Sequence, residues 1–225
     1  MELSSPAAVS RIRDKYGLQP TKSLGQNFIT DANIVQKIID GARQVVENYK
    51  PTIKIDPKWE TVKLGSVFKL ASGRGLPSKD REHGEYYVYG GNGITGLHNA
   101  YFVENPTIVI GRVGEYCGAT HITSPKCWVT DNALMATDFY TEIDLKYLWI
   151  MLNQLNLRQY AKVGGQPSIS QTTVYDRSIP LPPIEIQKTI AGRIEEELAV
   201  IEQNKRLIEI FQQKIKDKIA EVWGE

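Results

Sequence analysis

The residue types that could carry catalysis are few in this 225-residue chain, and their spacing does not suit it. Three histidines, His83, His98 and His121, stand in loop-rich stretches without an HxxxH or HExxH arrangement, so they do not predict a metal site. Cys117 and Cys127 do not form a CxxC pair. We expect reduced structural thiols in a cytoplasmic protein, with a disulfide or a metal site as the alternatives.

Two further kinds of chemistry are tested by motif. The glycine-dense segment 91–96 follows aromatic residues and leads to no helix, so it does not predict a phosphate cradle. An adenine methyltransferase needs a cofactor-binding glycine motif at a strand–helix junction and an Asn/Asp-Pro-Pro-aromatic segment. The Pro-Pro pair here, Pro182-Pro183, is flanked by Leu181 and Ile184. The sequence therefore predicts a binding module without catalysis, metal or cofactor of its own.

Composition is that of an ordinary globular protein, with 41% hydrophobic and 24% charged residues. No apolar run approaches the ~20 residues of a membrane span, and the first residues lack the pattern of a signal peptide. We therefore expect no membrane association. Net charge is only +1, so any binding to nucleic acid must rest on local clusters of basic residues.

The sequence pattern predicts an α+β fold in three parts, and these parts must position the binding residues. Residues 1–58 are expected to hold a short helical leader, a helix over about 32–49 and an extended linker. Residues 59–183 are expected to form a β-rich domain, and residues 184–225 one long helix. The second helix has Asp31 as a candidate N-cap and is ended by Pro51. Its predicted apolar face consists of Ile34, Ile38, Val45, Val46 and Tyr49.

The middle part has the texture of short strands joined by tight turns. Most of the 18 glycines fall between Gly65 and Gly118. Strands are predicted at 61–64, 86–89, 107–110, 119–122 and 133–136. A helix over 144–160, a loop over 164–168 and a returning strand over 174–181 are expected to follow.

The long helix carries a strict heptad repeat, which indicates that it lies along another helix. Isoleucine occupies position a at 194, 201, 208 and 215, and Val222 continues the series. Position d holds Ile190 and Phe211 but also Glu197, Asn204 and Lys218, and such polar insertions fix register and partner number. The predicted dimerisation residues are Ile190, Ile194, Ile201, Ile208, Phe211, Ile215 and Val222. The partner helix can come from residues 32–49 or from another chain, and the alternative is a helix folded back on its own domain.

Several landmarks between Trp59 and Trp223 together resemble the DNA-specificity subunit of type I restriction-modification systems. They are, in order, Trp59 with Leu64-Gly65, the loop with Gly73 and Pro77, and the segments 89–94, 108–114, 128–133, 165–169 and 179–187. The match covers one target recognition domain and one long spacer helix. Family members usually carry two of each. The resemblance therefore implies a non-catalytic half-subunit that pairs with a second copy, or a fragment of a longer subunit.

The resemblance implies double-stranded DNA, a methyltransferase subunit and a restriction subunit as partners. Arg or Lys commonly reads guanine, and Asn or Gln commonly reads adenine. The candidate DNA-binding residues in polar loops are Arg74, Lys79, Arg81, His83, Tyr87, Asn92, Arg112, Tyr116, Lys126, Gln166 and Ser168. A homodimeric protein-binding scaffold without DNA recognition is the alternative function.

A separate resemblance concerns the first part of the chain. Residues 21–31, Thr-Lys-Ser-Leu-Gly-Gln-Asn-Phe-Ile-Thr-Asp, are similar to the opening of ribosomal RNA adenine dimethyltransferases. The cofactor glycines and catalytic tetrapeptide of that family are absent, so no activity is carried over. A remnant of such an enzyme that binds S-adenosylmethionine is a third hypothesis, and we expect no such binding.

Overall fold

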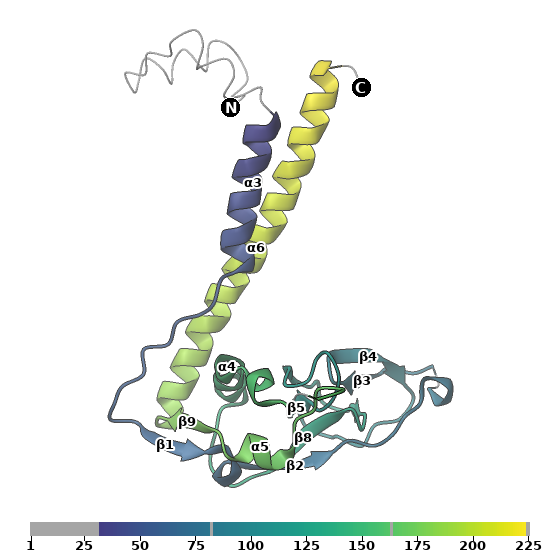
Figure 1. The fold of residues 1–225 in the computed structure, drawn as a ribbon, viewed down its shortest axis with the longest axis vertical. Coiled ribbons are helices and arrows are strands. Elements are labelled where there is room, and N and C mark those ends of the chain that lie inside the picture. Colours follow the sequence, from purple (N-terminus) through teal and green to yellow (C-terminus); the bar gives the residue numbers. More distant parts are fainter. Residues whose placement is uncertain (1–31, 82, 163, 224–225) are drawn as a thin grey trace. The chain divides into compact units, whose positions relative to one another are not determined.

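The computed structural model describes residues 32–81, 83–162 and 164–223, in two compact units (Figure 1). One unit comprises Thr52–Glu196. The other contains the described residues up to Pro51 and those from Glu197 onwards. The expected leader helix and the segment 21–31 lie outside the described residues.

The elements follow one another along the chain as a helix, a series of short strands and a final long helix. The helices are α3 (Ala32–Glu47), α4 (Leu145–Leu155), α5 (Gln171–Tyr175) and α6 (Ile184–Trp223), with 3-10 turns η1 (Leu64–Ser66), η2 (Ser78–Asp80) and η3 (Leu157–Tyr160). The strands are β1 (Glu60–Lys63), β2 (Phe68–Ser72), β3 (Tyr86–Gly90), β4 (Gly93–His98), β5 (Ile108–Gly111), β6 (Thr120–Ile122), β7 (Trp128–Val129), β8 (Ala133–Phe139) and β9 (Ser178–Leu181). This α+β architecture confirms the predicted fold class.

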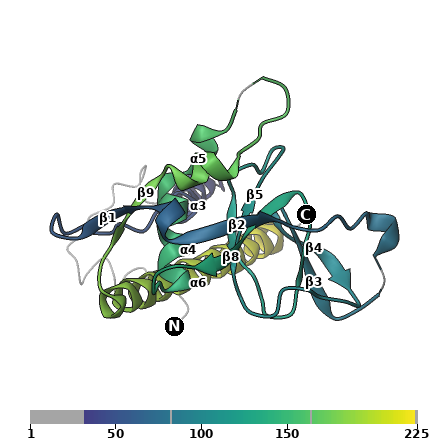
Figure 2. The same ribbon diagram turned by 90° about the horizontal axis from the view of Figure 1, so that it is seen from below.

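The centre of the Thr52–Glu196 unit is a four-stranded antiparallel sheet in the order β2-β8-β5-β6. Figure 2 shows β2 and β8 side by side. All four residues of β5 are buried, and three of them are the β-branched residues Ile108, Val109 and Ile110. Such a continuous apolar run suits a central strand that is covered on both faces. The sequence pattern therefore placed β5 correctly.

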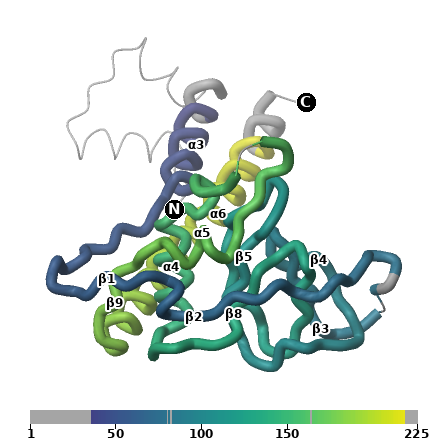
Figure 3. Tube along the Cα trace, turned by 60° about the horizontal axis from the view of Figure 1, so that its bottom comes forward, coloured from purple at the N-terminus to yellow at the C-terminus, as the bar shows by residue number. Residues whose placement is uncertain are grey.

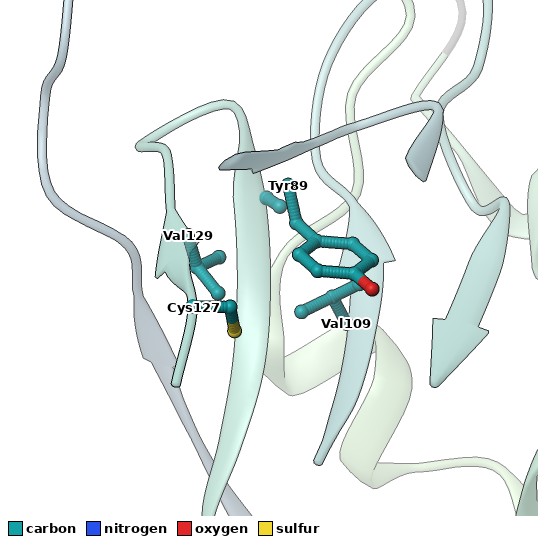
Figure 4. Packing of buried hydrophobic residues seen from close by; sticks show 5 residues of the cluster. Tyr89, Val109, Cys127 and Val129 are labelled. Carbon is teal, nitrogen blue, oxygen red and sulfur yellow. The ribbon is translucent and has the colours of Figure 1, made fainter. Parts of the chain in front are cut away.

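A second sheet of three strands, β4-β3-β7, carries the candidate Tyr87 on β3 and the candidate Asn92 in the turn between β3 and β4. Strand β3 pairs antiparallel with β4 and parallel with β7. A buried cluster joins this sheet to the central one, because Tyr89 and Val129 pack with Val109, Ala133 and Cys127 (Figure 4). The hairpin β3–β4 is thereby attached to the core through its aromatic residue.

Helix α4 begins where the sequence pattern predicts. The Asp144 carboxylate accepts a hydrogen bond from the Tyr147 backbone N–H at 2.9 Å and caps the helix. Trp149 Nε1 donates to the Thr120 carbonyl at 3.0 Å, which ties the helix to β6. Tyr147 is fully buried and its hydroxyl donates to the Pro180 carbonyl at 2.8 Å. Burial raises the pKa of Tyr147 to about 12, so this donor stays protonated at neutral pH.

The start of α6 is held by the buried side chain of Gln187, which is 1% exposed. Its Oε1 accepts from the Asp144 backbone N–H at 2.9 Å, and its Nε2 donates to the Pro182 carbonyl at 2.8 Å. One amide therefore provides hydrogen-bond partners both for the backbone N–H at the start of α4 and for the carbonyl just after β9. The observed bounds of α6 match the predicted helix from Ile184 to Trp223.

In the other unit, α3 lies antiparallel beside the C-terminal part of α6 (Figures 1 and 3). Arg43 donates to the Gln212 side chain at 2.5 Å, and the Tyr49 hydroxyl donates to the Glu197 carboxylate. The described partner of the long helix is thus a helix of the same chain. The buried residue of α3 is Ile39, 8% exposed, and the predicted face residue Ile38 is 63% exposed.

Other expectations differ from the structure locally. The returning strand was expected to begin at Val174, but residues 171–175 form α5, because the Ser170 hydroxyl caps a helical turn by accepting from the Thr173 N–H at 3.1 Å. Strands β2, β4 and β7 were not predicted. The first follows a 3-10 turn, the second is rich in glycine, and the third has two residues.

Replacement of Gln187 by leucine is expected to lower the free energy of unfolding by on the order of 2–4 kcal/mol, because the Asp144 N–H and the Pro182 carbonyl lose their buried partner. Urea denaturation followed by circular dichroism measures this. Ile186→Ala, at an exposed neighbour on the same helix, is the control and should change stability by less than about 0.5 kcal/mol. Equal effects of the two variants would contradict the role assigned to Gln187.

Candidate nucleic-acid interface

One group of the predicted residues surrounds the β3–β4 hairpin. Arg81 Nη1 donates to the Thr95 carbonyl of β4 at 2.7 Å, while its buried Nε has no hydrogen-bond partner among the described residues. This bond fastens the segment before β3 to the hairpin. Lys79 and His83 on either side are exposed. Arg81 thus has a structural contact, whereas the side chains of Lys79 and His83 are exposed.

The outer part of the hairpin presents Tyr87 and Asn92. Tyr87 is 44% exposed and pairs across β4 with Leu97, which is 46% exposed. Asn92 is exposed at the two-residue turn, and Gly93 after it has a φ of 83°, a conformation that glycine adopts without strain. The turn therefore places Asn92 at the exposed tip of the hairpin.

A second feature is a network of aromatic rings with cationic side chains over their faces. The Trp128 ring meets His98 and Phe102 edge-on, with centroids 5.3 and 5.1 Å apart. The Arg74 guanidinium lies 4.2 Å over the Phe102 ring, and Trp128 Nε1 donates to the Arg74 carbonyl at 3.0 Å. Because stacking on an aromatic face orients a guanidinium, Arg74 is held in a restricted position.

Lys126 is placed in a similar way. Its ammonium lies 5.7 Å from the Tyr101 ring centroid, and that ring packs edge-on against Tyr86 at 4.7 Å. Lys126 has a φ of 51°, which is uncommon outside glycine and directs its exposed side chain from a tight turn. Two of the predicted cations therefore belong to an aromatic surface formed by residues from separate segments.

The remaining predicted residues lie elsewhere on the unit. Arg112 and Ser168 line one polar hollow, and Arg112 Nη1 donates to the Ser72 hydroxyl at 3.1 Å. Gln166 is exposed near Gly114, and Tyr116, 48% exposed, lines a different hollow together with Arg158. The predicted set is thus divided between the hairpin with its aromatic network and two separate hollows.

Sequence reasoning missed three kinds of residue near this surface. Phe102 and Trp128 organise the aromatic network, and Lys162 shares the hollow with Arg112. The recurrence of aromatic and basic residues over 98–102 and 126–128 was a signal for the network. Lys162 had none, because only the fold brings it to residues distant in sequence.

The predicted dimerisation residues have three different environments. Ile190 and Ile194 are buried in the Thr52–Glu196 unit, at 9% and 0% exposure. Ile201, Ile208 and Ile215 are partly buried in the unit that contains α3. Phe211 is 56% exposed. Val222 lies within α6, at a position where the side chain is outside the described part.

His121 on β6 is the histidine with a perturbed environment. A methyl group added at Gly93 would lie 3.2 Å from its imidazole Cε1, so the ring lies against the glycine backbone of the hairpin. Its Nε2 is buried without a hydrogen-bond partner among the described residues. Burial lowers the pKa of His121 below its ordinary value of 6.5, which favours the neutral ring.

The shift of His121 has a consequence for stability at acid pH. The unfolded chain binds a proton near pH 6.5, whereas the folded chain resists it, so this contribution to stability is complete above that pH and is lost as pH falls from there toward the lower folded pKa. We expect the free energy of unfolding to fall less between pH 8 and pH 5 in His121→Gln than in the wild type. Urea titrations at both pH values measure this. His83→Gln, at an exposed site, should retain the wild-type dependence, and a wild-type dependence in His121→Gln would refute the assignment.

Among the described residues, no group of three or more His, Cys, Asp and Glu side chains is placed to hold a metal ion. No helix within the same residues is long and apolar enough to cross a membrane. The geometry of the site is that of exposed cations, amides and aromatic rings on a rigid β-rich unit. Such side chains are the kind expected on the surface of a protein that binds a polar, anionic ligand.

The comparisons with known proteins identify the family within this class. The sequence model of the type I restriction modification DNA specificity domain matches residues 57–212, which is more than half of the chain. The chain therefore belongs to this family, and the resemblance noted from its motifs is confirmed. In type I systems the specificity subunit is the non-catalytic component that recognises DNA.

Individual relatives agree with this placement. Over 134 residues the chain is 28% identical to the Escherichia coli type I restriction enzyme EcoprrI specificity subunit, which corresponds to 57% of this chain and 33% of the relative. Among solved structures, the S subunit from M. genitalium matches with a TM-score of 0.55 at 16% identity, covering 93% of this chain and 53% of that one. The HsdS subunit from Thermoanaerobacter tengcongensis matches with a TM-score of 0.56 at 18% identity, covering 86% and 55%. The chain thus spans about a third to somewhat over half of the length of these relatives.

A second set of matches is short. The chain is 55% identical to ribosomal RNA small subunit methyltransferase A of Natranaerobius thermophilus over 42 residues, which is 19% of this chain and 14% of the enzyme. The corresponding enzyme of Pelotomaculum thermopropionicum is 52% identical over 78 residues, or 26% of its length. These partial matches agree with the resemblance noted in the first residues and leave most of that enzyme unmatched.

Proposed function

We propose that this chain is a sequence-specific DNA-binding specificity subunit that acts as a half-subunit of a type I restriction-modification complex. It holds a methyltransferase subunit and a restriction subunit on a bipartite target, inside the cytoplasm where that DNA lies. The observation that carries the proposal is the specificity-domain match over residues 57–212, which includes most of the unit that presents the exposed cations and amides. Base edges in the major groove are read by such groups, and backbone phosphates by further cations.

The aromatic network supports a recognition role over simple charge attraction. Arg74 is stacked on Phe102 and Lys126 lies over Tyr101, so both cations are oriented before any ligand arrives. Preorganised side chains lose less conformational entropy on binding than free ones. Specific readout needs such fixed directions, because a hydrogen bond to a base edge is lost when the donor is misplaced.

Loss of the Arg74 or Lys79 side chain is expected to weaken binding to the preferred sequence by about 1–3 kcal/mol if that residue contacts a base edge, with relaxed specificity. Gel-shift assays with methylated and unmethylated genomic fragments, in the presence of the methyltransferase subunit, measure both effects. Lys69→Ala, at an exposed lysine of β2, is the control. Arg81→Ala requires a parallel melting curve, because Arg81 also holds Thr95. Binding without any salt-sensitive sequence preference would end the proposal.

We infer a homodimer from one face of the α3–α6 pair. On α6, Val200, Leu207 and Phe211 are 54%, 47% and 56% exposed. At about 100° per residue they lie roughly 60–100° to one side of Ile208, which is partly buried. A stripe of large apolar side chains left open along a helix needs a partner in water.

The exposed apolar residues of α3 lie on the same side of the pair. Ile38 and Val45 are 63% and 75% exposed and lie about 100–120° from the buried Ile39, in the same rotational sense as the α6 stripe. Because the two helices are antiparallel, equal rotation on each places both stripes on one face. Two copies of this face would form a four-helix bundle with twofold symmetry, and a symmetric pair would read two oppositely oriented half-sites.

The double variant Leu207→Ser, Phe211→Ser is expected to shift the protein from dimer to monomer, because it removes apolar surface that the second copy would bury. Light scattering coupled to size exclusion measures the mass. Glu209→Ser, on the other flank of α6, should leave the mass of the dimer unchanged. A wild-type protein that is monomeric at every concentration, or a double variant that stays dimeric, would contradict the pairing.

A protein-binding scaffold remains the second candidate, and the same apolar face favours it. The gel-shift assay distinguishes the two candidates. A scaffold would still dimerise, and loss of the Arg74 or Lys79 side chain would not change its behaviour.

A further inference from the structure

The hollow that contains Arg112 is formed by three segments far apart in sequence. Its volume is about 440 Å³, and its polar lining includes Ser72, Arg112, Lys162, Ser168, Gln171 and Thr172. Ser72 ends β2, Arg112 follows β5, and the others belong to α5 and the segment that leads into it. The fold, and not sequence proximity, brings these groups together.

Backbone hydrogen bonds hold the walls of the hollow in place. The Ile169 N–H donates to the Arg112 carbonyl at 2.9 Å, and the Lys162 N–H donates to the Ser168 carbonyl at 2.9 Å. Between Lys162 and Ser168 the chain reverses through Gly165, whose φ of 96° favours glycine. The two segments that carry cations are therefore fixed to one another through main-chain contacts.

A hydrogen bond orients the guanidinium of Arg112. Its Nη1 donates to the Ser72 hydroxyl at 3.1 Å, which leaves the other guanidinium N–H groups available. Ser170 at the rim bonds the hydroxyls of Thr172 and Thr173 at 2.8 Å each, so the hydroxyl-bearing wall is also ordered.

The charge of this hollow is unbalanced. Its lining contains two cationic side chains and no aspartate or glutamate. The ion pairs found among the described residues involve Lys63, Lys146, Lys188, Lys205 and Arg206, and neither Arg112 nor Lys162. Two cations with hydroxyl and amide donors beside them form a site complementary to an anion with several oxygen acceptors.

We propose that this hollow binds a backbone phosphate of duplex DNA, with Lys162 and Arg112 as the charged contacts. The inference rests on the proposed function and deepens it. It adds Lys162 to the DNA-binding residues and assigns Arg112 and Ser168 to the sugar-phosphate backbone, although sequence reasoning grouped them with base-reading candidates. A duplex carries one negative charge per ~1.7 Å of its axis, and it releases counterions when such cations bind. Both cations are exposed, so an isolated phosphate ion would gain little from them at physiological salt.

Counterion release supplies the test. Binding of the full chain to a fluorescein-labelled duplex of roughly 30 base pairs and mixed sequence is followed by anisotropy between about 50 and 200 mM NaCl. For Lys162→Met and for Arg112→Met we expect the slope of log K against log salt to become shallower by about 0.9, as for loss of one phosphate contact. Lys162→Arg should keep the wild-type slope, because it keeps the charge.

The control is Lys69→Met. Lys69 is an exposed lysine of β2 that alternation places on the opposite face of the strand from Leu70 and Ser72, and its loss should leave the slope unchanged. Melting curves confirm that each variant is folded. A second measurement compares duplexes of different sequence: a phosphate contact weakens all of them equally, whereas a base contact changes their ranking.

The outcomes separate this inference from the proposed function. If the wild type binds duplex with a salt-dependent affinity but Lys162→Met has the wild-type slope, the phosphate site is wrong and the proposed function stands. If Arg112→Met changes the ranking of sequences, Arg112 reads a base and the assignment is overturned. If inorganic phosphate displaces the duplex far more strongly than chloride at equal ionic strength, and Lys162→Met abolishes this difference, the hollow is a site for the free ion. If the wild type binds no duplex under any condition, it is the proposed function that fails.

Discussion

The packing around the start of α6 in the Thr52–Glu196 unit depends on the buried amide of Gln187. A primary amide can accept and donate at once, and here it does both, to the Asp144 N–H and the Pro182 carbonyl. The first turn of α6 is thereby joined to the first turn of α4 and to the end of β9. Ile190 and Ile194 then bury in the same core one and two turns further on. The first turns of α6 are consequently held within this unit by its own buried side chains.

How much of this was predictable depends on the range of the interactions involved. The bounds of α6 followed from its heptads and from Pro182-Pro183, and β5 followed from its apolar run, because both signals are local. The orientation of α3 did not follow. Its sequence offers Ile38 and Ile39 on adjacent positions, and only the contact with α6 decides that Ile39 is buried. Likewise Val174 and Tyr175 matched the start of a strand, and only the cap at Ser170 places them in the helical turn of α5.

The candidate interface likewise contains features that local sequence signals predict and features that depend on contacts between distant segments. A cluster of basic residues beside tyrosines could be seen in the sequence around Arg74 and Tyr86. The pairing of Arg74 with Phe102 could not, since it requires two separate segments to meet. The predicted cations around the hairpin differ in consequence. Arg74 and Lys126 lie over aromatic rings, Arg81 is bonded to the backbone of β4, and Lys79 is exposed. A surface of this kind can combine direction with general attraction to a polyanion, which are the two parts of nucleic-acid recognition.

The pairing of α3 with α6 joins the two ends of the described chain. The Tyr49–Glu197 bond spans 148 residues, and the Arg43–Gln212 bond spans 169. During synthesis α3 emerges long before its partner helix exists, whereas the unit from Thr52 to Glu196 is complete while the last turns of α6 are still in the ribosome. The apolar side of α3 therefore has no contact with α6 until α6 has been synthesised. Contacts between such distant residues form late and slowly. The topology therefore favours one order of assembly, in which the Thr52–Glu196 unit folds first and the pairing of α3 with α6 forms last.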